Sequence, residues 1–328
     1  MSVPRGTQPT KTRATYAIGV DIGGTKVAAG VVDTSGAIVH EVRRSTPTKD
    51  VRETETAIAE AVQELRASYD VLAVGIGAAG WIASDRATVL SSPHLAWRNE
   101  PLRDALSDRI GLPVTVENDA NAAAWAEYRF GAVRDEPVVV CITLGTGIGG
   151  GLVVAGTLYR GAYGVAGEWG HMCMVPGGRR CACGNRGCWE MYASGTALAR
   201  DAIELAEISP VAAHRLLELV DGDISKLTGQ EVRIAAQEGD HAAVEIFTAM
   251  GRHLGEGIAS LAAVLDPSAF VIGGGVSDAG DLLLAPAREA FARSLTGRGF
   301  RPLARIEQAR FGPSAGLVGA ADLARRRI

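Results

Sequence analysis

The order of apolar and polar positions predicts two similar blocks of strands and helices. In the first block, apolar strands at 17–20 and 27–32 flank a Gly-rich turn. A second turn, at 33–36, leads into a third strand. Apolar residues from Ala57 to Leu65 then recur at helical spacing. Short aliphatic strands follow at 71–76 and 114–116, and the second of them leads into an Ala-rich helix. This alternation indicates an α/β protein.

The second block opens with the same design. The stretch "VVVCITLGTGIGGGLVVAGTLYRG", 138–161, again places a Gly-rich turn between two apolar strands. Apolar residues from Val244 to Leu265 step by threes and fours, which predicts a long buried helix that Asp266-Pro267 ends. A strand at 270–272, a last strand near Ile306 and a closing helix in "SAGLVGAADLARRR" follow. We therefore expect two related α/β units, each opening with a Gly-rich hairpin.

Length and charge narrow the class of protein. A chain of 328 residues is long for one hydrophobic core, so two domains are expected. The net charge of -4 favours neither nucleic acid nor an anionic membrane as a partner. No apolar run approaches the roughly 20 residues that span a bilayer, and "MSVPRGTQPTKTRAT" lacks the apolar core of a signal peptide. We expect a cytoplasmic protein with reduced thiols and a loose N-terminal tail.

Both Gly-rich turns resemble nucleotide-binding motifs without matching them. "GTGIGG" fits the dinucleotide fingerprint, and "GVDIGGTK" nearly fits a P-loop, but both motifs require a helix to follow. A strand is predicted after each turn instead. We interpret both as hairpin turns whose backbone N–H groups approach phosphate oxygens, which glycine permits because it has no Cβ. The alternative is that they are only tight turns.

Four of the five cysteines fall in "GHMCMVPGGRRCACGNRGCWE", 170–190. His171, Cys181, Cys183 and Cys188 have the spacing H-x9-C-x-C-x4-C, and three thiolates with one imidazole form the closed set typical of structural Zn²⁺. Cys173 lies beside a predicted strand at 172–175 and is interpreted as a small core residue. Cys141 is predicted to lie in the core as well. Two carboxylates, those of Glu168 and Glu190, flank this loop, and the metal would fix their positions.

The motifs "DIGGTK", "ENDANAAAWAE", "LGTGIGGG", "GEWGH", "CACGNRGCWE" and "IGGGVS" occur in the order seen in ROK-family sugar kinases. From about Tyr16 to its end, the chain resembles that family, and within it the bacterial glucokinases. The resemblance implies an actin-like ATPase (hexokinase/ribonuclease H-like) fold, with two related α/β domains around a cleft. It also suggests a homodimer or homotetramer. The domains expected are a flexible tail (1–15), a small domain (16–131, completed by the helix at 313–328) and a large domain (132–312) with its zinc-binding loop (171–188).

The resemblance also implies the activity, which is ATP-dependent phosphorylation of glucose at the 6-hydroxyl. Asp119 would be the general base, because a carboxylate can accept the proton of a weakly acidic hydroxyl as it attacks phosphorus. On sequence alone, either Asn118 or Asp119 could instead cap the Ala-rich helix. The residues expected to bind the sugar are Gly80, Asn118, Asp119, Glu168, His171 and Glu190. The residue before Gly80 departs from the family's pattern, because this chain has Ala79 where the family's loop usually has proline.

The nucleotide site is implied in the same way. Asp21 would hold Mg²⁺, directly or through water, against the ATP phosphates. The residues expected around the nucleotide are Gly23, Gly24, Thr25, Lys26, Thr146, Gly147, Gly274 and Gly275.

Three alternatives remain open at this point. The acceptor could be another hexose, such as fructose, mannose or an N-acyl hexosamine, and polyphosphate could replace ATP as the donor. A sugar-responsive transcriptional regulator is a more distant alternative, because only about 15 polar residues precede "DIGGTK", which leaves no room for the helix-turn-helix domain that such proteins carry.

Overall fold

Two five-stranded sheets form the framework of the computed structural model, which describes residues 15–327. In the first sheet the strands lie in the order β3-β2-β1-β4-β8. β1 pairs antiparallel with β2, and β2 with β3, whereas β4 and β8 continue the sheet in parallel with β1. The strands are β1 (Tyr16–Ile22), β2 (Lys26–Val32), β3 (Ile38–Ser45), β4 (Val71–Ala78) and β8 (Val114–Asn118).

The second sheet repeats this topology. Its order is β11-β10-β9-β12-β13, with an antiparallel meander of β9, β10 and β11 and with β12 and β13 parallel to β9. The strands are β9 (Val138–Leu144), β10 (Ile148–Val154), β11 (Thr157–Tyr159), β12 (Ala269–Gly273) and β13 (Arg305–Gln308). The α/β class and the duplication predicted from the two Gly-rich hairpins are therefore confirmed.

Each sheet has its own hydrophobic core. On the first sheet, α1 (Val51–Arg66) and α2 (Leu102–Ile110) contribute buried apolar side chains such as Ile58 and Leu106. The core of the second sheet is built by α4 (Gly195–Ile208), α5 (His214–Glu218), α6 (Gly229–Gln237), α7 (His241–Leu265) and α8 (Asp281–Ser294). α7 is the predicted long helix, and it ends at Asp266, as expected before Pro267.

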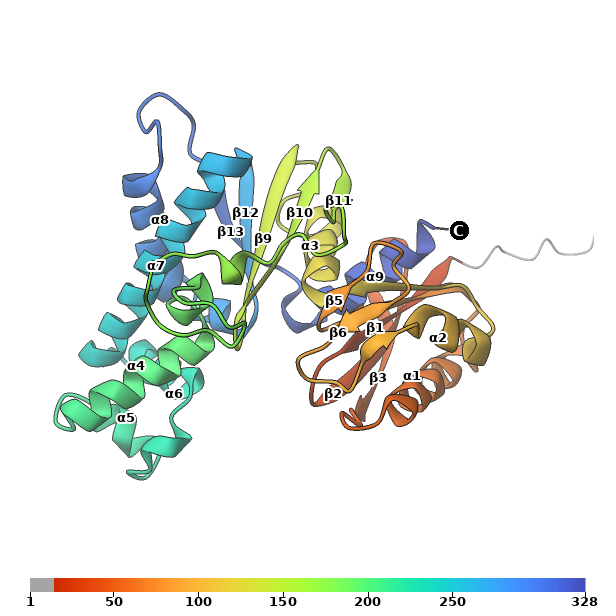
Figure 1. Cartoon of the computed structure of the whole chain (residues 1–328), viewed down its shortest axis with the longest axis horizontal. Helices are drawn as coiled ribbons and strands as arrows, with labels where there is room; N and C mark the ends of the chain where they lie inside the picture. Colours follow the sequence, from red (N-terminus) through yellow and green to blue (C-terminus); the bar gives the residue numbers. More distant parts are fainter. Residues whose placement is uncertain (1–14, 328) are drawn as a thin grey trace, which may run out of the picture.

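Two further helices cross between the sheets. α3 (Asp119–Phe130) follows the last strand of the first sheet but packs on β9 and β10 of the second. α9 (Ala315–Arg325) follows the last strand of the second sheet and packs on β1 and β4 of the first. The two helices lie side by side between the sheets (Figure 1). Their contact is tight, because a Cβ at Gly319 would collide with the Ala122 carbonyl.

The segment around Cys173 differs from its prediction. No strand forms at 172–175, where only one isolated bridge joins Cys173 to Cys188. Met172 and Met174 pack against the second core, so the intervening Cys173 points outward and is exposed. Its interpretation as a core residue was wrong, whereas Cys141 is buried as predicted.

A small third sheet, β5 (Trp81–Ile82), β6 (Val89–Ser91) and β7 (Arg98–Glu100), was not predicted. Among the helices of residues 15–327, none is both long and apolar enough to cross a membrane. The tail predicted at 1–15 falls almost wholly outside the described residues. The limits of the two expected domains stay a prediction.

Candidate active site

Asn118 and Asp119 occupy the junction between β8 and α3. The Oδ1 atom of Asn118 accepts a hydrogen bond from the Asn121 N–H at 2.9 Å, so Asn118 is the residue that caps α3. Its Nδ2 donates to the Gly80 carbonyl at 3.1 Å and to Asp119 Oδ1 at 3.0 Å. Both donors of Asn118 are therefore used within the protein, and a sugar hydroxyl would find only the second lone pair of Oδ1. Asp119 Oδ2 makes no hydrogen bond to the described residues.

Asp21, near the end of β1, and Asp119 form a pair of carboxylates with raised pKa values. Burial and, to a smaller extent, the charge of Asp119 raise the pKa of Asp21 to about 7, and Lys26 opposes the shift. Burial also raises the pKa of Asp119, although hydrogen bonds from the Ala120 N–H and from Asn118 oppose this. Both carboxylates hold a proton more tightly than usual, and together they attract a cation.

A pocket of about 160 Å³ brings both carboxylates together with parts of the second sheet. Its lining includes Asp21, Asp119, Thr143, Gly273, Gly274 and Gly316. A Cβ at Gly316 would lie 3.0 Å from Asp21 Oδ1, so α9 begins directly beside this carboxylate. Gly274 has φ +82°, and a Cβ there would collide with the backbone of Leu144. Three predicted site residues, Asp21, Asp119 and Gly274, therefore meet in one pocket.

The other predicted nucleotide residues lie in turns outside this pocket lining. In the first hairpin, the Gly23 N–H donates to the Lys26 carbonyl at 3.1 Å, and Gly24 and Thr25 complete the turn. In the second, the Gly145 N–H donates to the Gly147 carbonyl at 3.0 Å, with Thr146 between them. Strands follow both turns, as expected. Gly275 begins a short 3-10 turn after β12 and is exposed.

The predicted zinc ligands converge. The ligand atoms of His171, Cys181, Cys183 and Cys188 all lie within 4.8 Å of one another. Cys181 Sγ is 3.6 Å from His171 Nδ1, and Cys183 Sγ is 3.6 Å from Cys188 Sγ. Tetrahedral Zn²⁺ with Zn–S bonds of about 2.3 Å separates two sulfurs by roughly 3.8 Å. The donor set therefore fits a four-coordinate structural zinc ion.

Glu168, His171 and Glu190 adjoin this cluster. His171 Nδ1 lies 3.6 Å from Glu190 Oε1 and faces the thiols, while Nε2 lies 3.9 Å from Glu168 Oε2. With Nδ1 turned to the metal position, Nε2 remains for another partner. Burial raises the pKa of Glu168, the charge of His171 opposes this, and the nearby charge of Asp119 adds to it. A Cβ at Gly147 would collide with the Glu190 carboxylate, so the second Gly-rich turn touches this group of residues.

Sequence reasoning missed a buried ion pair beside the base candidate. Glu117, the last residue before Asn118, and Arg160, just after β11, have side chains only 1% and 8% exposed. Their closest atoms, Arg160 Nε and Glu117 Oε2, lie 3.0 Å apart. Glu117 could have been suspected from its place in "END", but no local pattern marks Arg160.

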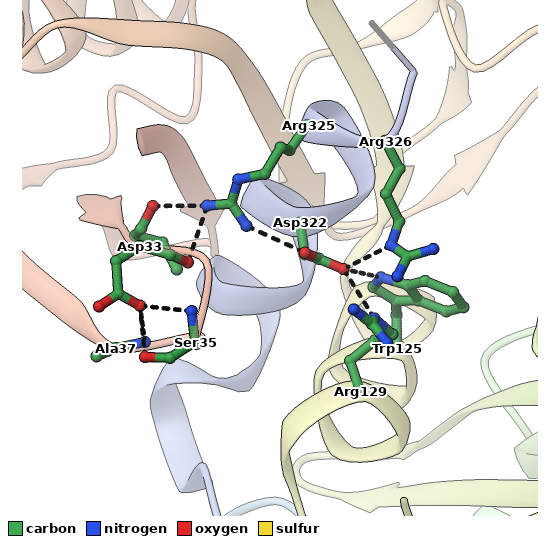
Figure 2. Close-up of polar contacts among 9 residues, drawn as sticks. Asp33, Ser35, Ala37, Trp125, Arg129, Asp322, Arg325 and Arg326 are labelled. Atoms are coloured by element: carbon green, nitrogen blue, oxygen red, sulfur yellow. Dashed lines mark hydrogen bonds and ion pairs between the residues drawn. The ribbon is translucent and has the colours of Figure 1, made fainter. Parts of the chain in front are cut away.

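Asp322 of α9 fixes the far half of α3. Its carboxylate accepts hydrogen bonds from Trp125 Nε1 at 2.9 Å and from Arg129 Nε at 3.2 Å, both on α3. Figure 2 shows Arg325 on one side of Asp322 and Trp125, Arg129 and Arg326 on the other, with Arg325 also donating to the Asp33 carbonyl. This network holds the far halves of the two crossing helices in register.

Comparison with known proteins places the chain in a family. A family model described as the ROK family matches residues 17–327. The chain is similar to a glucokinase of Streptomyces coelicolor, with 51% identity over 94% of this chain and 97% of the relative. It is also similar to a crystal structure of a ROK family glucokinase from Streptomyces griseus in complex with glucose and AMPPNP, with 52% identity, a TM-score of 0.87 and 95% and 99% of the two chains covered.

A ROK hexokinase structure from Thermus thermophilus matches with 36% identity and a TM-score of 0.79, covering 95% of this chain and 98% of the other. The predicted actin-like α/β fold is confirmed by these neighbours.

Proposed function

The chain belongs to the ROK family and is an ATP-dependent hexose kinase, and we propose that it phosphorylates glucose at the 6-hydroxyl with Asp119 as the general base. The observation that carries this proposal is the pocket that Asp119, Asp21 and the glycines at the end of β12, Gly273 and Gly274, line together. This pocket supports the proposal because a candidate proton acceptor, a candidate magnesium ligand and a candidate phosphate-binding turn all line it.

The base role follows from the surroundings of Asp119. Asp119 Oδ1 is held by the Ala120 N–H and Asn118 Nδ2, which leaves Oδ2 to accept a proton. Because burial raises the pKa of this carboxyl, its proton affinity suits general base catalysis. As the sugar oxygen bonds to the γ-phosphorus of ATP, the bond to ADP breaks and the hydroxyl proton passes to Asp119.

Asp21 would hold Mg²⁺ at the end of β1, directly or through water, and the ion would neutralise charge on the phosphates. We assign the phosphate contacts to the hairpin turns Gly23–Lys26 and Thr146–Gly147, together with Gly274 in the pocket wall and the adjacent Gly275. Each turn offers backbone N–H groups with little steric bulk.

Sugar recognition is assigned to Gly80, Asn118, Glu168, His171 and Glu190. Zn²⁺ held by His171, Cys181, Cys183 and Cys188 would stiffen the loop that carries three of these groups. In this arrangement His171 binds the metal through Nδ1 and offers Nε2 to a sugar hydroxyl.

A panel of sugars and donors tests the proposal. Glucose, fructose, mannose and N-acetylated hexosamines are each assayed with ATP and with polyphosphate, and the product is identified by ³¹P NMR. We expect glucose with ATP to give the highest kcat/KM and a 6-phosphate product. Strong activity on another hexose beside negligible activity on glucose would overturn glucose as the substrate, and a preference for polyphosphate would overturn ATP as the donor.

A further inference from the structure

The Glu117 carboxylate is the centre of a buried polar network next to the base candidate. Its Oε1 accepts hydrogen bonds from the Asn118 N–H at 3.0 Å, from Asn121 Nδ2 at 3.2 Å and from Arg160 Nε at 3.1 Å. Its Oε2 lies 3.0 Å from Arg160 Nε and 3.4 Å from Arg86 Nε. Glu117 is therefore bound to the backbone and side chains of the turn that presents Asp119.

Arg160 extends this network to a distant segment. Its Nη1 donates to the Ser84 carbonyl at 3.2 Å, and its Nη2 donates to the carbonyls of Ala83 at 3.1 Å and Ile82 at 3.4 Å. These carbonyls belong to the end of β5 and the two residues after it, close in sequence to Gly80, whose own carbonyl accepts from Asn118. One planar guanidinium thus joins the Gly80 segment to the Asn118–Asp119 turn.

The backbone of Arg160 belongs to a third part of the site. It follows β11 of the second sheet, and its carbonyl accepts the Ala166 N–H at 3.1 Å. This segment leads directly to Glu168, and it packs so closely on residues 82–84 that a Cβ at Gly164 would collide with their backbone. Arg160 therefore connects the base candidate, the Gly80 segment and the entry to the zinc-binding loop.

We propose that Arg160, through Glu117, is a positioning residue that sets the distance between the proposed proton acceptor Asp119 and the proposed sugar-binding residues Gly80 and Glu168. This inference rests on the proposed role of Asp119 as the base. Arg160 touches no reacting atom. Its guanidinium is suited to the task because five N–H donors in a rigid fork can hold one carboxylate and several carbonyls at once. Lysine, a single ammonium point charge, cannot reproduce that set of contacts.

The kinetic test compares Arg160→Met, Arg160→Lys and Glu117→Gln with the wild type. The sugar is the hexose with the highest kcat/KM in the panel above. A misplacement of about 1 Å at a catalytic group can lower the rate about 100-fold. We therefore expect kcat to fall about 100-fold in Arg160→Met and at least tenfold in Arg160→Lys. KM for ATP should stay within about twofold. The matched control is Arg215→Met, which removes an exposed bidentate pair with Glu238 and should leave kcat unchanged.

Arg160→Lys keeps a positive charge beside Glu117 and provides the folded variant if Arg160→Met does not accumulate. A loss of kcat below tenfold in folded Arg160→Lys would overturn the proposal. An equal rise of KM for both substrates, with kcat unchanged, would also overturn it, because that pattern indicates a general loss of structure.

Hydrogen exchange of the substrate-free protein separates this proposal from the proposed function. In Arg160→Lys we expect faster amide exchange at residues 82–84 and 118–121 than in the wild type, with unchanged exchange in the control. This readout needs no sugar and no activity. If glucose is not the substrate, the proposed function fails while the exchange result still decides on the positioning role. Unchanged exchange in both segments would overturn that role whatever the substrate is.

Discussion

The two sheets share one topology and carry different chemistry at equivalent positions. Asp21 is the sixth residue of β1, and Thr143 is the sixth residue of β9. Each pairs with a glycine of the neighbouring parallel strand, Gly77 and Gly273 respectively. The last strand of the first sheet is followed by Asp119, whereas the last strand of the second is followed by Ala309 and an uncharged 3-10 turn. Asp21 and Asp119 therefore both stand at strand ends of the first sheet, and the third carboxylate of the pocket, Glu127, lies on α3.

This asymmetry has a physical reason. A polyphosphate is repelled by carboxylates and attracted by backbone N–H groups, so a second set of acids at the matching strand ends would oppose its binding. A cation and a proton require the opposite environment, which Asp21 and Asp119 provide. Between β11 and α4, the second sheet carries the loop with the proposed zinc ligands. Under the proposed function, duplication supplies the framework, and divergence at a few strand ends separates proton and metal chemistry from phosphate contacts.

The largest effect is expected from the first sheet. Asp119→Asn keeps the shape of the side chain but cannot accept a proton, and we expect kcat to fall about 10³-fold. Sugar binding, measured by calorimetry, should stay within a few-fold of the wild type. Thr143→Val, at the pocket wall of the second sheet, is the matched control and should lose far less activity. Activity of Asp119→Asn within tenfold of the wild type would remove Asp119 as the base.

A substitution in the proposed zinc-binding loop tests the contribution of the second sheet to sugar binding. Cys183→Ser removes one of four proposed ligands, so we expect zinc content by atomic absorption to fall and KM for the sugar to rise by about 10- to 100-fold. The effect on kcat should be smaller than that of Asp119→Asn, because the loop orients the sugar and takes no proton. Cys173→Ser, an exposed thiol in the same loop, should keep its zinc and its KM. Full activity of metal-free Cys183→Ser would contradict a structural role for zinc.

A substitution at the contact between α3 and α9 should lower the stability of the protein more than its activity. Asp322→Asn weakens the bonds of a buried carboxylate to Trp125 and to three arginines, so we expect the free energy of unfolding to fall by about 3 kcal/mol. Because Asp322 lies far along the helices from the start of α3, kcat should change less than about threefold. Asp281→Asn, an exposed partner of Arg288, should change stability by less than about 0.5 kcal/mol in the same denaturant titration. Equal effects of the two substitutions would show that the network does not stabilise the helix pair.

Much of the fold could be predicted because its signals are local. Apolar runs, Gly-rich turns and helical spacing marked most strands and helices of both sheets, and the repeated hairpin revealed the duplication. The third sheet was missed because its strands are only two or three residues long, too short for alternation to be visible. The orientation of Cys173 was missed because the packing of its two methionine neighbours decided it.

The candidate site could be predicted only where its residues stand in a motif. The proposed zinc ligands have a typical spacing, but sequence alone does not show that Asn118 caps α3 while its Nδ2 donates to the Gly80 carbonyl, 38 residues away. Arg160 meets Glu117 across 43 residues, and nothing in the intervening sequence indicates that contact. Such long-range polar contacts depend on the assembled tertiary structure.

The smallest effect concerns stability and pH, and it follows from placing both carboxylates on one sheet. Burial raises the pKa of Asp119 in the folded protein above its unfolded value, so its favourable contribution belongs to the protonated form and is lost as the pH rises through the folded-state pKa. Asp119→Asn stays neutral at every pH. We therefore expect its melting temperature to exceed that of the wild type by a few degrees at pH 8, and the difference to shrink as the pH falls toward 4. The charge of Asp119 also helps to raise the pKa of Asp21, so its removal acts in the same direction.

Thermal unfolding of the ligand-free proteins between pH 4 and pH 8 measures the trend, with Thr143→Val as the control whose difference from the wild type should not depend on pH. A difference for Asp119→Asn that is constant across this range would mean that the ionised carboxylate costs the folded protein no stability, and the contrast between the two sheets would then be one of catalysis alone.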